Sequence, residues 1–154
     1  MFMLRKYFTK GEMFRTDYLV RNGRLVIEFD DMKMSAICNL GFVFQAYNLI
    51  NSMTALENVE FPLVFKRIPG KKRKKLAREM LVKVGLGSRL AHKPKEMSGG
   101  QQQRVGIARA FVAMPEIVFA DEPTGNLDNK TSQDVLGLMR ITSRKFAQTI
   151  VMIT

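Results

Sequence analysis

Two short apolar runs separated by a helical pattern place the strongest constraint on the fold. Residues 117–120 read IVFA and residues 149–153 read TIVMI. Apolar runs of this length are typical of strands buried on both faces in parallel sheets. Between them, residues such as Val135 and Met139 recur at helical spacing over 131–145. A strand, a helix and a parallel strand form the repeating unit of α/β proteins, so we expect an α/β core.

The remaining pattern predicts a mostly helical insert in this core. Thr54 is followed three residues later by Glu57, a capping-box arrangement that starts a helix, and we expect Pro62 to bend or end that helix. Gly85 lies where the second helix would be capped. The expected strands are 24–29 and 41–44, the expected helices are 54–65, 74–84 and 100–114, and the insert covers about 54–97.

The composition is that of a globular protein and excludes several classes. Of the 154 residues, 46% are apolar and 25% are charged, which argues against wholesale disorder. The longest apolar run, residues 110–114, is far shorter than the roughly 20 residues that a membrane-spanning helix needs, and the first residues lack the regions of a secretory signal. One cysteine, Cys38, and one histidine, His92, exclude an internal disulfide and a zinc cluster. We therefore expect a cytoplasmic protein in which any metal is held by oxygen.

The net charge of +11 raises nucleic-acid binding as one function class. Residues 66–78 carry eight basic and no acidic side chains, so this segment is either a phosphate-binding stripe or a solvated helix face. Aromatic residues do not interleave with the basic ones, which weakens the nucleic-acid hypothesis.

Two acids directly follow the first buried run. Asp121 and Glu122 lie at the carboxyl end of this strand, the edge at which open α/β sheets bind ligands. The first acid is suited to hold Mg²⁺ and the second to orient an attacking water. The alternative is that Asp-Glu-Pro merely opens a surface loop.

A second candidate site is the segment MSGGQ at 97–101. It stands at the start of a predicted helix, where free N–H groups and the helix dipole attract anions. The alternative is that Ser98 is an ordinary helix N-cap followed by flexible glycines.

Taken together, these segments resemble one family. MSGGQQQRVGIARA followed by IVFADEPTGNLD is similar to the signature motif, Walker B motif and D-loop of the ABC (ATP-binding cassette) ATPases, and GFVFQAYNLINSMTALENVEFPL is similar to their Q-loop strand and the opening of their helical subdomain. Within this family, the amino-acid sequences of these segments resemble those of ATPases paired with lipoprotein-releasing, macrolide-export and antimicrobial-peptide-resistance permeases.

The resemblance covers residues 40–154 and implies an incomplete P-loop-NTPase-like core. Residues 1–39 are expected not to match. The implied segments are the Q-loop strand 41–45, the helical subdomain at about 54–97, the signature 97–101, the Walker B motif 117–122 and the D-loop 126–128.

The resemblance also implies a role for each site residue. Asp121 and Gln45 would bind Mg²⁺, Gln45 would also touch the attacking water, and Glu122 would be the general base. Asp128 would couple two sites across a dimer, although Asn126 departs mildly from the family wording. The γ-phosphate of an ATP held chiefly by the opposite subunit would be contacted by Ser98, Gly99, Gly100 and Gln101.

One family motif is missing from this sequence. A P-loop needs G-x-x-x-x-G-K-[ST], and the only Gly-Lys pair, Gly70-Lys71, belongs to the basic run. The sequence ends at Thr154, where the family continues into a phosphate-sensing histidine. We expect either a shortened or rearranged copy of an ABC ATPase, which we favour, or a polypeptide that works beside another chain.

These observations leave three hypotheses for function. The first is an ATP-binding subunit that uses ATP and Mg²⁺ to drive export or extraction of a substrate through a membrane permease. It would pair with a second ATPase subunit at the inner face of the membrane, with activity impaired by the missing P-loop. The second is a non-catalytic interaction module or degenerate gene remnant, and the third is a nucleic-acid-binding protein.

Overall fold

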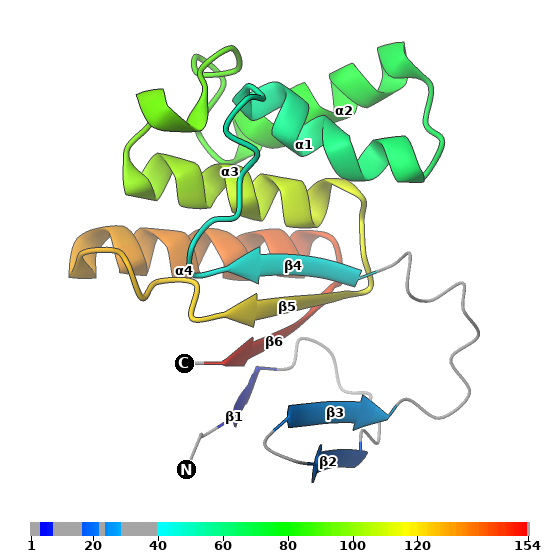
Figure 1. The fold of residues 1–154 in the computed structure, drawn as a ribbon, viewed down its shortest axis with the longest axis vertical. Coiled ribbons are helices and arrows are strands. Elements are labelled where there is room, and N and C mark those ends of the chain that lie inside the picture. The colour runs from blue at the N-terminus through cyan, green and yellow to red at the C-terminus, as the bar shows by residue number, and fades with distance from the viewer. Residues whose placement is uncertain (1–3, 8–16, 22–23, 29–39, 154) are drawn as a thin grey trace.

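A computed structural model describes residues 4–7, 17–21, 24–28 and 40–153 of the protein. Helices lie above a sheet of four strands (Figure 1), ordered β1-β6-β5-β4. Three neighbouring strands of this sheet, β6, β5 and β4, are parallel to one another, as expected for an α/β core. Their bounds are Leu40–Phe44 for β4, Ile117–Asp121 for β5 and Thr149–Ile153 for β6.

The N-terminal strands pair in two different ways. β1 (Leu4–Tyr7) runs antiparallel to β6 at the edge of the sheet. β2 (Asp17–Arg21) and β3 (Arg24–Glu28) form a separate antiparallel hairpin, which confirms the strand predicted near residues 24–29. Cys38 lies outside the described residues.

The helices follow the predicted order. α3 lies between the sheet and the outer helices α1 and α2 (Figure 1), and it also contacts α4. None of the helices described here is both long and apolar enough to cross a membrane. The bounds are Ala55–Phe65 for α1, Gly70–Lys83 for α2, Pro94–Glu96 for the 3-10 turn η2, Gly99–Val112 for α3 and Asn129–Lys145 for α4.

The capping box at the start of α1 is confirmed. The Glu57 N–H donates to the Thr54 hydroxyl at 3.2 Å, and the Thr54 N–H donates to the Glu57 carboxylate at 2.7 Å. Pro62, however, lies inside α1 and does not end it. Val59 and Leu63 on either side of it are fully buried, so packing of the helix offsets the one hydrogen bond that proline cannot make.

α2 begins four residues earlier than its apolar pattern predicts. The helix starts at Gly70, so Lys71, Lys72, Lys74 and Lys75 of the basic run belong to its first turns. Its buried face is formed by Ala77, Met80 and Leu81. At its end, Gly85 has a φ of +79°, which confirms the predicted glycine cap, since this left-handed conformation is strained for residues with a Cβ.

The prediction that the β5 strand is buried on both faces is wrong. Val118 and Ala120 are buried on the face that α3 and α4 cover, whereas Phe119 on the opposite face is only half-buried. Phe42 of β4 stacks on Phe119 with ring centroids 5.7 Å apart and is 46% exposed. The core of the described chain therefore lies between one face of the sheet and the helices.

Candidate functional site

Three parallel strands end level with one another at the edge predicted to bind ligands. Phe44 of β4 pairs with Asp121 of β5, and Asp121 pairs with Ile153 of β6. Gln45 and Glu122 are the next residues along their strands, and both acids are exposed while Gln45 is half-buried. The structure thus places Gln45, Asp121 and Glu122 along a single edge of the sheet.

The backbone at Glu122 is held in an unusual conformation. Its φ is +38°, in the left-handed region that costs energy for an L residue. The Glu122 N–H donates to the Ile153 carbonyl at 2.9 Å, and the Glu122 carbonyl accepts from the Gly125 N–H at 3.0 Å. Bonds on both sides therefore fix the chain at the predicted general base.

The segment 125–128 contacts the Q-loop residue. The Asn126 side-chain amide donates to the Gln45 carbonyl at 3.2 Å. A Cβ at Gly125 would lie 2.6 Å from the Gln45 side-chain nitrogen, so any larger residue here would require this amide to move. Asn126 is the residue that departs mildly from the family motif, and its side chain connects the predicted D-loop to the predicted Q-loop.

A strained turn follows Gln45, and an arginine of α3 holds it. Tyr47 and Asn48 have φ values of 61° and 46°. The Arg109 guanidinium donates to the Asn48 carbonyl at 2.6 Å and to the Tyr47 carbonyl at 3.0 Å. Burial lowers the pKa of Arg109, but a guanidinium keeps its proton in proteins. No sequence pattern indicates this role of Arg109, because its partners are backbone atoms about 60 residues away.

The interpretation of Ser98 as a helix N-cap is confirmed. The Gln101 N–H donates to the Ser98 hydroxyl at 3.4 Å, and the Ser98 N–H donates to the Gln101 side-chain oxygen at 3.0 Å. These bonds start α3 and orient both side chains. A serine hydroxyl that accepts a hydrogen bond still has its own proton to donate, so capping is compatible with binding of an anion.

The two signature glycines are packed rather than flexible. Both lie in the first turn of α3. A Cβ at Gly99 would lie 2.8 Å from the Tyr47 hydroxyl, and one at Gly100 would lie 2.6 Å from the Thr131 methyl group. The start of α3 is therefore packed tightly between the turn after the Q-loop and the start of α4.

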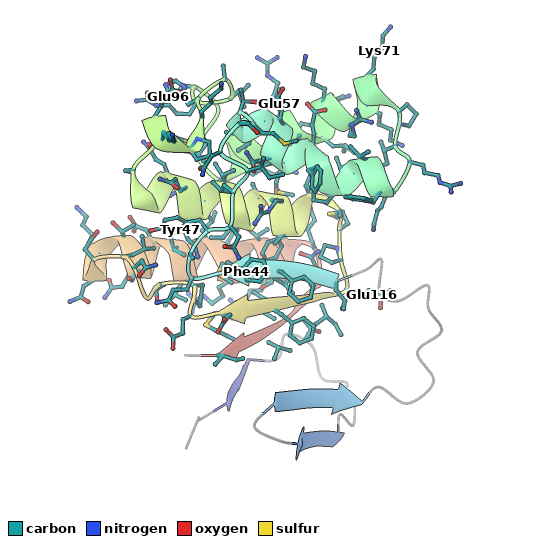
Figure 2. The ribbon with its side chains drawn as sticks, viewed as in Figure 1. Phe44, Tyr47, Glu57, Lys71, Glu96 and Glu116 are labelled. Atoms are coloured by element: carbon teal, nitrogen blue, oxygen red, sulfur yellow. The ribbon has the colours of Figure 1, made fainter. Side chains whose placement is uncertain are left out.

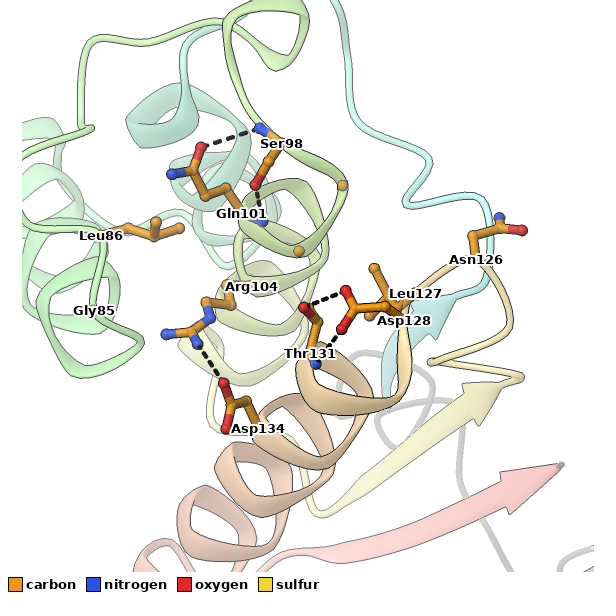
Figure 3. Close-up of a pocket in the computed structure, with 12 residues that line it drawn as sticks. Gly85, Leu86, Ser98, Gln101, Arg104, Asn126, Leu127, Asp128, Thr131 and Asp134 are labelled. Atoms are coloured by element: carbon orange, nitrogen blue, oxygen red, sulfur yellow. Dashed lines mark hydrogen bonds and ion pairs between the residues drawn. The ribbon is translucent and has the colours of Figure 1, made fainter.

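A pocket of about 470 Å³ joins the signature to the D-loop (Figure 3). The first turn of α3 lies on one side and the start of α4 on the other. Arg104 and Asp134 form an ion pair of 3.9 Å across it. Five of its twelve lining residues are predicted to contact the nucleotide or couple the two sites, and the other seven are not. The lining consists of Ser98, Gly99, Gly100, Gln101 and Asp128 together with Gly85, Leu86, Arg104, Asn126, Leu127, Thr131 and Asp134.

Asp128 is the N-cap of α4. Its carboxylate accepts from the Thr131 hydroxyl at 2.6 Å and from the Thr131 and Lys130 N–H groups at 3.0 and 3.1 Å. The hydrogen bond from the Thr131 side chain, followed by that from its backbone, lowers the pKa of Asp128. The carboxylate is therefore ionised at neutral pH and fixed beside the pocket.

The predicted site residues thus form two groups. Gln45, Asp121 and Glu122 lie at or just after the strand ends, and the remainder line the pocket. Buried Gln103 of α3 donates to the Pro123 carbonyl at 2.5 Å, which links the signature helix to the loop after the acids. His92 lies in the loop before the signature and contacts Arg89, away from both groups.

The residues at the strand ends carry the oxygen atoms that Mg²⁺ takes as ligands. No group of three His, Cys, Asp or Glu side chains suitable for a metal occurs within the described parts of the chain. Mg²⁺, however, commonly uses only one or two carboxylates together with phosphate oxygens and water. Asp121 and Gln45 offer such oxygen ligands.

Comparison with known proteins decides the family. The ABC transporter family model matches residues 9–125. The chain is 48% identical over 134 residues to an uncharacterized ABC transporter ATP-binding protein of Thermotoga maritima, covering 86% of this chain and 57% of the relative. It is 57% identical over 100 residues to the lipoprotein-releasing system ATP-binding protein LolD of Syntrophotalea carbinolica, covering 65% of this chain and 44% of LolD.

This chain belongs to the ABC transporter family. Its fold agrees with that conclusion, because the ATP-binding cassette MJ0796 of Methanocaldococcus jannaschii superposes with a TM-score of 0.67 at 39% identity. That structure is a dimer in a post-hydrolysis state bound to ADP and Pi, and the match covers 87% of this chain and 60% of MJ0796.

The extent of the family match differs from the expected one. It begins at residue 9 and so extends into residues 1–39, for which the motifs indicated no resemblance. The chain spans 57% of the Thermotoga relative and 44% of LolD.

Proposed function

We propose that this chain is part of the ATP-binding subunit of an ABC transporter, coupling ATP hydrolysis to export or extraction of a substrate through a membrane permease. The observation that carries the proposal is the pocket between the first turn of α3 and the start of α4. It brings Ser98, the signature glycines and Asp128 to one surface. The α3 N-terminus offers N–H groups and a positive dipole end to a phosphate.

We infer that this pocket serves an ATP held chiefly by a second subunit. The sequence has no G-x-x-x-x-G-K-[ST] segment, so the phosphate cradle would come from residues outside this chain. Ser98 would donate its hydroxyl proton to the γ-phosphate, and Gly99 and Gly100 would present backbone N–H groups. The solved dimer of MJ0796 with ADP and Pi supports pairing of two such subunits.

The residues after the strands would serve a second ATP. Bound Mg²⁺ and ATP would supply an electrophilic phosphoryl group with its charge neutralised. Asp121 and Gln45 would provide metal ligands. Glu122, held by its bonds to Ile153 and Gly125, would orient the attacking water and accept its proton. The two groups of residues would then act on different nucleotides.

The partners proposed are a second ABC ATPase subunit and a permease. Similarity to the lipoprotein-releasing protein LolD supports a permease of that general type and a position at the inner face of the membrane. A second candidate function is a non-catalytic module that binds such partners without turnover. The lack of a P-loop sequence favours this candidate.

A complementation experiment tests the proposal. This chain is mixed with a full-length relative whose own signature serine is replaced by arginine, and phosphate release is followed. We expect restored hydrolysis that is lost with Ser98→Arg and kept with Glu122→Gln. Ser88→Arg, at an exposed loop serine, is the matched control and should leave the restored rate unchanged.

The outcome separates the candidates. No restored hydrolysis, together with partner binding by the chain, would support the non-catalytic module. Loss of restored hydrolysis with Glu122→Gln would contradict the assignment of Glu122 to a different nucleotide from Ser98.

A further inference from the structure

An apolar stripe runs along the outer face of α1. Phe61, Val64 and Phe65 are 38%, 46% and 73% exposed, and their spacing of three and four residues places them on one side of the helix. The two phenylalanine rings make an edge-to-face contact with centroids 5.2 Å apart. Val59 and Leu63 already bury the inner face, so packing of α1 within the described chain does not account for the stripe.

A cationic surface lies on the neighbouring helix. α2 packs against α1, and an ion pair of 3.5 Å between Arg73 and Glu60 joins the two helices. Figure 2 shows Lys71 at the outer end of the helical layer, pointing away from the sheet. In the portion of the chain that the structure places, six exposed cations of α2 have no carboxylate within 4.0 Å, namely Lys71, Lys72, Lys74, Lys75, Arg78 and Lys83.

The stability of α2 does not explain this charge. Lys71 and Lys75 are four residues apart, as are Lys74 and Arg78, and like charges at that spacing destabilise a helix. Glu79 is the single acid of α2. Because the lysines disfavour the helix that carries them, an anionic partner accounts for them better than folding does.

We propose that the stripe of α1 and the cations of α2 form one surface that lies on an anionic lipid bilayer. The helices join through residues 66–69 at one end of the helical layer (Figure 1), and Phe65 and Lys71 on the two sides of this connection are both exposed. Phe61, Val64 and Phe65 would enter the headgroup boundary, and the lysines would lie among the lipid phosphates.

A bilayer matches both halves of this surface. It presents anionic phosphates above an apolar layer, so cations and apolar side chains are satisfied together. A nucleic-acid duplex would engage the cations and leave Val64 and Phe65 in water, which is why we favour the bilayer. The surface is separate from the signature pocket, and this proposal does not depend on the proposed function.

Sedimentation with vesicles tests the electrostatic half. We expect the chain to pellet with phosphatidylcholine vesicles that contain phosphatidylglycerol and not with phosphatidylcholine alone. Each basic residue near an anionic surface raises binding about fivefold, so Lys71→Gln with Lys75→Gln should weaken partitioning by about tenfold or more. The control pair, Lys130→Gln with Lys145→Gln on α4, should change it by about twofold or less. Equal losses for the two pairs would overturn the proposal.

Fluorescence tests the apolar half. The sequence contains no tryptophan, so Phe65→Trp introduces a single reporter. Its emission should shift to shorter wavelength with anionic vesicles, whereas Ile141→Trp on α4, at a side chain that is 66% exposed, should not shift. Equal shifts at both positions, or none at Phe65→Trp, would contradict insertion. Tighter binding of the chain to a DNA duplex than to vesicles, weakened by the α2 substitutions, would overturn the bilayer in favour of nucleic acid.

Discussion

Replacing Arg109 by methionine should destabilise the protein through the turn after the Q-loop. Methionine keeps most of the length of the side chain and removes both charged donors. The change breaks the bonds of 2.6 and 3.0 Å to the Asn48 and Tyr47 carbonyls. These bonds join α3 to two residues in the left-handed region of backbone conformation. Without them, fewer contacts keep those two residues in that conformation.

The expected change in the free energy of unfolding is the balance of one unfavourable and two favourable contributions. A hydrogen bond from a charged group contributes about 1.5–3 kcal/mol, and the Asn48 side of the contact is exposed, so water partly replaces that bond. Removing a half-buried cation recovers part of its desolvation cost, and relaxing the strained turn returns roughly 1 kcal/mol. We therefore expect the free energy of unfolding to fall by about 2 kcal/mol.

Urea denaturation followed by circular dichroism measures this difference. Arg140→Met is the matched control, because Arg140 is exposed on α4, and it should change the free energy of unfolding by about 0.5 kcal/mol or less. Arg109→Lys should fall between the two, since one ammonium replaces a fork that spans two carbonyls. A loss for Arg109→Met no larger than that of the control would refute the reasoning.

Two further predictions concern packing and capping. Gly99→Ala should lower the free energy of unfolding by about 1–3 kcal/mol, because its Cβ would meet the Tyr47 hydroxyl at 2.8 Å, and Tyr47→Phe in that background should restore part of the loss. Gly137→Ala in α4, where a Cβ meets nothing within 4 Å, should instead stabilise by about 0.5–1 kcal/mol in thermal or urea unfolding; a loss there would contradict the steric argument. The lowered pKa of Asp128 means that its carboxylate stabilises the fold above the unfolded pKa of about 3.9 and that this contribution disappears as the pH falls through the folded value. Asp128→Asn should therefore be less stable than the native chain at pH 7 and approach it in acid, and an equal difference at both pH values would contradict this assignment.

Local chemistry explains why much of the fold could be predicted. The Thr54 and Ser98 caps and the Gly85 helix end depend on atoms within a few residues of one another. The parallel strands also follow from short apolar runs. The contiguous motifs were sufficient to indicate the family that the comparisons establish. The roles assigned to Gln45 and Glu122 in catalysis remain predictions.

Tertiary structure decided the features that depend on distant atoms. Arg109 holds a turn 61 residues away, and Asn126 reaches Gln45 across 81 residues; neither pairing leaves a periodic signal in the sequence. Pro62 stays inside α1 because Val59 and Leu63 are buried around it. Phe119 is only half-buried, although the apolar run 117–120 indicated a strand buried on both faces. An apolar run determines that a strand forms, but coverage of each face depends on which elements pack there, and that depends on the whole arrangement of the chain.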